Sequence, residues 1–64
     1  MPAYRIIMHP YNVEIAENHY IHAENTRDAK FKSLKFQCGK SYRKIEYLRK
    51  TEMEVREECG IFED

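Results

Sequence analysis

The feature that most constrains this fold is the segment IHAENTRDAK, residues 21–30, in which strand-forming residues give way to helix formers. Asn25 is a favoured N-cap residue, because its side chain can accept a hydrogen bond from a free N–H of the first helical turn. Asp28 follows three residues later, where an acidic group complements the helix dipole and a capping box places Glu. The segment therefore predicts a strand ending near Ala23 and a helix that runs to about Cys38.

The predicted helix has an apolar face of its own. Phe31, Leu34 and Cys38 recur at spacings of three and four, which is typical of one buried helical face. Gly39 then follows, and glycine readily adopts the left-handed conformation that ends helices. Phe36 points away from this face and indicates a second contact surface.

Two strands are predicted before the helix. Residues 4–9, YRIIMH, are rich in β-branched and aromatic residues, and Pro10 ends the run because it has no N–H to donate. Residues 13–23 are ambiguous: they fit one long strand with a bulge, or a short strand, a turn at Glu17-Asn18 and a further strand. We favour a strand over residues 18–23, antiparallel to the first.

A second helix is expected after Ser41, which is a favoured cap residue. Its apolar positions are Ile45, Leu48, Val55 and Cys59, and Glu52 interrupts them. The helix therefore either continues to Cys59 or ends near Lys50, in which case EMEVRE, residues 52–57, forms a strand. We favour the helix. Gly60 is expected to follow its end, with Ile61 folded back onto the last turn and the final two residues, Glu63 and Asp64, frayed.

These elements predict one small α+β domain over residues 1–64: an antiparallel β-hairpin or small sheet followed by two helices packed on one face, in the order β-β-α-α. A chain of this length hides only about 60% of its unfolded surface, so its core is small. The expected core residues are Ile6, Ile21, Phe31, Leu34, Ile45 and Leu48.

The net charge of zero conceals three blocks. Residues 1–26 carry one cation and three anions, residues 27–50 carry nine cations and two anions, and residues 51–64 carry one cation and six anions. The basic middle either pairs with the acidic tail or faces a partner. No apolar run is long enough to span a bilayer, and two cysteines are too few for a disulfide scaffold, so we expect a cytoplasmic protein without membrane contact.

The sequence carries no recognisable chemical site. No glycine-rich phosphate loop precedes the helix at Asn25, and Cys38 and Cys59 are too far apart in sequence for a zinc knuckle. His19 and His22 are three residues apart and should point to opposite faces of a strand. We read both cysteines as small apolar residues and expect no catalytic residues, no bound metal and no cofactor, hence no enzyme.

Binding to another protein is the expected function. Apolar residues off the main helix faces, Phe36, Tyr47 and Met53, are candidates for an exposed patch. The alternative is a nucleic-acid-binding module that uses the basic region 27–50, with Tyr42 and Tyr47 stacking on bases. The candidate partner-binding residues are Lys32, Lys35, Phe36, Arg43, Lys44 and Tyr47. A homodimer is a further alternative.

A strand that ends in A-E-N, followed by a helix with A-K and an aromatic residue, resembles small accessory proteins of bacteriophages and prophages. The matching residues are Ala23, Glu24, Asn25, Ala29, Lys30 and Phe31, followed by Ile45, Tyr47 and Leu48. The likeness covers about residues 19–50. It implies a β-β-α-α fold, an unassigned activity and a role in binding a host or phage protein, including inhibition of a defence protein.

Overall fold

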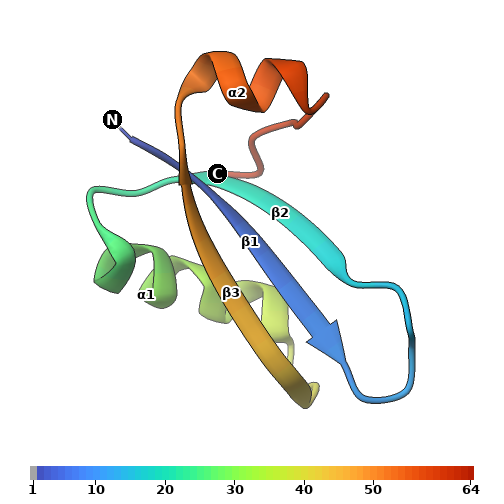
Figure 1. The fold of residues 1–64 in the computed structure, drawn as a ribbon. Helices are drawn as coiled ribbons and strands as arrows, with labels where there is room; N and C mark the ends of the chain where they lie inside the picture. The colour runs from blue at the N-terminus through green and yellow to red at the C-terminus, as the bar shows by residue number, and fades with distance from the viewer. Residues whose placement is uncertain (1) are drawn as a thin grey trace.

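The computed structural model describes residues 2–64, which form three strands and two helices (Figure 1). In chain order these are β1 (Ala3–Pro10), β2 (Glu17–His22), α1 (Thr26–Gln37), β3 (Tyr42–Lys50) and α2 (Glu52–Glu57). The strands form one antiparallel sheet in the order β2-β1-β3. The α+β class is confirmed. The order β-β-α-α is wrong, because a third strand separates the helices.

The junction between β2 and α1 is as predicted. The Asn25 side chain accepts a hydrogen bond of 2.8 Å from the backbone N–H of Asp28, and Asp28 accepts one of 3.1 Å from the N–H of Glu24. The Asn25 bond therefore satisfies one free N–H of the first turn, and the Asp28 bond ties the residue before the cap to that turn. The helix ends where Cys38 and then Gly39 adopt positive φ angles of 46° and 75°. The favoured strand at residues 18–23 is also confirmed, as β2.

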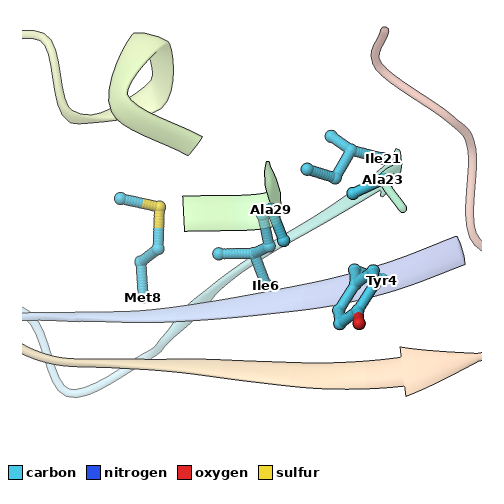
Figure 2. Close-up of a cluster of buried hydrophobic side chains, with 6 residues drawn as sticks. All are labelled: Tyr4, Ile6, Met8, Ile21, Ala23 and Ala29. Carbon is cyan, nitrogen blue, oxygen red and sulfur yellow. The ribbon is translucent and has the colours of Figure 1, made fainter. Parts of the chain in front are cut away.

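The main core lies between the sheet and α1. It consists of Tyr4, Ile6, Met8, Ile21, Ala23 and Ala29 (Figure 2). Alternate β1 residues supply half of this set, because side chains two apart share a face of a strand. Two expected core residues, Ile6 and Ile21, are fully buried, and Ile45 of β3 packs against the cluster.

The face of α1 that packs on the sheet is not the predicted one. Ala29 and Ser33 are buried, whereas Phe31 is 74% exposed and Leu34 is 58% exposed. Small side chains let the helix lie close to the strands, and Ser33 satisfies its hydroxyl by donating to the carbonyl of Lys30 at 2.8 Å. Phe36 lies beside this face and stacks on His19.

The predicted second helix is also wrong over residues 42–50, which form β3. The strand pairs with β1 along its length, and Tyr42, Ile45 and Tyr47 pack against the main core. A register shift opposite His9/Pro10 leaves Arg43 without a partner in β1. Leu48 points to the other face and is 40% exposed. Pairing of β3 with β1 satisfies backbone groups that β1 would otherwise expose, and this outweighs the helical spacing of the apolar residues.

Residues 52–57 form a separate short helix, α2, and not a strand. A capping box starts it: Thr51 accepts from the N–H of Glu54 at 3.1 Å, and Glu54 accepts from the N–H of Thr51 at 3.2 Å. Val55 is buried with Ala3 and Tyr20. Ala3 and Tyr20 are the chain neighbours of Tyr4 and Ile21, which face α1, so their side chains lie on the opposite face of the sheet. Helix α2 therefore covers the face opposite α1, and the two helices do not share one face.

The C-terminal segment lies along β2 and is not frayed. Phe62 forms a parallel bridge with Tyr20, and the N–H of Glu63 donates to the Tyr20 carbonyl at 2.9 Å. Gly60 permits this approach, because a Cβ there would lie 2.7 Å from a ring carbon of Tyr20. Ile61 does not fold back and is 80% exposed. None of the helices in residues 2–64 has the length and apolar character needed to cross a membrane.

The Asn25 cap predicts a specific stability difference. Asn25→Ala removes the acceptor for the Asp28 N–H and should lower the free energy of unfolding by about 1 kcal/mol. Asn25→Asp keeps an acceptor oxygen and should stay close to the original stability. Urea unfolding followed by circular dichroism measures both. Equal losses in the two variants would contradict a role for the capping bond.

Candidate interaction surfaces

The six residues predicted to bind a partner fall into two groups. Three are used within the fold: the Lys32 amine donates to the His22 carbonyl at 2.8 Å, Phe36 stacks on His19, and the Tyr47 hydroxyl lies 3.4 Å from that of Ser33. The other three, Lys35, Arg43 and Lys44, are exposed. Lys35 lies on α1, and Arg43 and Lys44 lie at the start of β3, so the six candidates come from two elements.

The acidic tail pairs mainly outside the basic middle. Glu58 receives hydrogen bonds from Tyr20 at 2.8 Å and Arg5 at 3.1 Å, and its other oxygen lies 3.0 Å from the Lys50 amine. The hydrogen bond with Lys50, followed by that with Tyr20, lowers the pKa of the Glu58 carboxyl group. Burial raises the pKa of Tyr20, and its bond to Glu58 adds to this. This network fastens α2 to the sheet.

Two histidines fasten the C-terminal segment to β2, and they lie on opposite faces of the strand as predicted. His19 is 2.8 Å from the Glu63 carboxylate and stacks on Phe36. His22 is 3.3 Å from the Asp64 carboxylate and stacks on Phe62. Across residues 2–64, no three side chains of His, Cys, Asp or Glu converge in a way that would hold a metal ion.

Most of the basic side chains are consequently left without an acidic neighbour. Of the tail's carboxylates, only those of Glu54 and Glu58 reach a cation of the basic middle, and that cation is Lys50. In the part of the chain that the structure describes, seven cations form no ion pair: Arg27, Lys30, Lys35, Lys40, Arg43, Arg49 and Arg56. The charge segregation of the sequence therefore persists on the folded surface.

Several of these cations surround apolar side chains on α1. The α1 outer surface, as we name it, consists of Arg27, Lys30, Phe31, Leu34 and Lys35. Phe31 and Leu34 lie on the side of the helix away from Ala29 and Ser33, the residues that face the sheet. The three cations are exposed around them, and the Lys30 amine also lies 6.0 Å from the centre of the Tyr47 ring on β3. Sequence reasoning missed this surface because it assigned Phe31 and Leu34 to the core. The signal that identifies it is the pair of small residues, Ala29 and Ser33, four apart on the opposite side of the helix.

An open concavity of about 490 Å³ lies at the end of the sheet. It is lined by Pro10, Tyr11, Asn12, Val13, Lys40 and Ser41. Its polar groups are the amide of Asn12, the amine of Lys40 and the hydroxyls of Tyr11 and Ser41. The two cysteines are elsewhere and are exposed free thiols at the ends of the helices, so the expectation that they pack as apolar residues is wrong.

The Glu58 network predicts a pH-dependent stability. The folded-state pKa of Glu58 lies below its ordinary value of 4.5, so its contribution is present above that pH and is lost as pH falls through the folded-state pKa. Glu58→Gln should therefore destabilise the protein at about pH 7 and have a smaller effect at about pH 3.

Urea unfolding at the two pH values measures this difference. Glu57→Gln is the matched control, because Glu57 is exposed and forms no ion pair within residues 2–64. It should change stability little at either pH. A Glu58→Gln effect of the same size at both pH values would contradict the assigned role of its charge.

The sequence matches no family model, and no curated protein or solved structure is significantly similar to it. The resemblance to phage accessory proteins therefore rests on the residues quoted above.

Proposed function

We propose that this chain is a protein-binding module that contacts its partner through the α1 outer surface. The observation that carries the proposal is the exposure of Phe31 and Leu34, one helical turn apart. Large apolar side chains exposed together are typical of interaction sites, and a few such residues commonly supply most of the binding energy. They are not needed by the core, which α1 contacts through Ala29 and Ser33.

The charges around these two side chains define the partner's chemistry. Arg27, Lys30 and Lys35 are exposed and form no ion pair within the described chain, and no acidic residue belongs to the surface. A complementary partner has an apolar pocket with carboxylates at its rim. Rim charges of opposite sign increase the association rate and help to exclude wrong partners.

The phage setting implied by the A-E-N-x-x-x-A-K pattern extends this proposal. In that setting the chain is an accessory protein that binds a host or phage protein, and a bacterial defence protein is one target of this class. Inhibition would follow from covering the target's surface. It requires no cofactor and no catalytic step from this chain.

Binding to nucleic acid is the alternative, favoured by the unpaired cations of the basic middle. The predicted stacking of tyrosine rings on bases has less support. The Tyr42 hydroxyl donates to Glu17 at 3.2 Å, and Tyr42 and Tyr47 both pack against the main core. Two partly buried rings are poor platforms for stacking on bases.

Capture experiments with matched variants test the proposal. Tagged protein should retain a stoichiometric protein from a nuclease-treated bacterial lysate, and isothermal titration with that purified protein gives the affinity. Combining Phe31→Ser with Leu34→Ser should weaken binding by about tenfold or more, because hot-spot residues contribute over 1 kcal/mol each. Met53→Ser is the control, since Met53 is an equally exposed apolar residue on α2, at 68%.

Three results would argue against the α1 outer surface. The first is undiminished binding by the double variant, and the second is an equal loss with Met53→Ser. The third is capture that disappears after nuclease treatment, together with strongly salt-dependent binding to DNA or RNA, which would instead favour the nucleic-acid module.

A further inference from the structure

The two edges of the sheet differ in how they are covered. The outer edge of β2 is occupied by the C-terminal segment: Phe62 bridges to Tyr20, and the His22 N–H donates to the Asp64 carboxylate at 2.8 Å. The outer edge of β3 has no neighbouring strand within residues 2–64. β3 is nine residues long, so it presents a row of unpaired N–H and C=O groups.

The charges along β3 do not prevent pairing with another strand. A lysine on an edge strand usually discourages strand addition. In β3, Lys44 is followed two residues later by Glu46, so the two side chains share one face and lie 3.6 Å apart. A hydrogen bond with His9, together with the nearby Lys44 amine, lowers the pKa of Glu46 and favours its anionic form. The middle of the edge therefore carries charges of both signs.

This charge pattern is complementary to itself in one antiparallel register. If β3 strands of two copies pair with Ile45 opposite Ile45, each Lys44 lies opposite Glu46 of the other copy. Opposite charges across strands are favourable, and this Lys44–Glu46 pair occurs twice by symmetry. A register centred on Glu46 would place Glu46 opposite Glu46, and like charges directly opposite are unfavourable.

From these observations we infer that β3 is a self-association edge, on which β3 of a second copy pairs antiparallel about Ile45 to join two sheets into one of six strands. This inference goes beyond the proposed function, because it uses a strand edge and not the α1 outer surface. Ile45, which packs against the main core, lies opposite itself at the centre of this register and loses further exposed area in the pair.

Charge exchange at Lys44 and Glu46 tests the inference. Sedimentation equilibrium of the full chain should give twice the monomer mass of 7.8 kDa as concentration rises. Lys44→Glu alone, or Glu46→Lys alone, turns each favourable cross-strand pair into a like-charge pair and should weaken the dimer by about tenfold or more. The double exchange restores opposite charges across the interface and should recover most of the original affinity.

Folding and surface controls make each outcome decisive. Lys44 and Glu46 lie on the sheet surface, and circular dichroism melting curves establish that each variant is folded. The inference is overturned if the original chain remains at 7.8 kDa up to about millimolar concentration, at which even a weak association would be visible. It is also overturned if single exchanges leave the dimer unchanged, or if only the Phe31→Ser and Leu34→Ser variant dissociates it, which would assign self-association to α1.

Discussion

The pairing of β1 with a strand on each side is the interaction on which the rest of this structure depends. β1 occupies the middle of the sheet, and its alternate residues Ile6 and Met8 are fully buried beneath α1. On its other face, Ala3 helps to bury Val55 of α2. One strand thus contributes to both clusters of buried residues, as does its neighbour β2, which supplies Ile21 to one cluster and Tyr20 to the other. The short C-terminal segment then covers the one edge of the sheet that β3 does not form.

Local chemistry made part of this fold predictable. The Asn25 cap, the strand at the start of the chain and the end of α1 near Gly39 each depend on neighbouring residues, and each was correctly predicted. The secondary structure of residues 42–50 was not predictable from neighbouring residues. Their apolar spacing fits a helix, and what makes them a strand is a partner, β1, that lies more than thirty residues earlier. Tertiary pairing overrides local propensity where a central strand needs a second neighbour.

The surface was likewise predictable only in part. Charge segregation was visible in the sequence and persists in the fold, because the acidic tail pairs with Arg5, two histidines and Lys50 and leaves most of the basic middle free. The α1 outer surface could not be found from hydrophobicity, since the largest apolar residues of the helix are the ones that face outward. Helices usually bury their largest apolar residues, whereas α1 packs on the sheet through alanine and serine. The physical reason is that small side chains let the helix lie close to the sheet. Sequence reasoning therefore located the charged region but not its apolar centre.

The position of β1 in the chain has a consequence for how the protein acquires its structure during synthesis. The central strand leaves the ribosome before the other four elements, whereas its neighbour β3 is complete only at Lys50 and the segment that covers β2 only at Asp64. Until then the chain offers a hairpin and a short helix, and two strands alone are marginal in water. Because a loop-closure cost precedes such distant contacts, pairing of β3 with β1 should follow formation of the β1–β2 hairpin and of α1, and one edge of β1 stays unpaired in the interval.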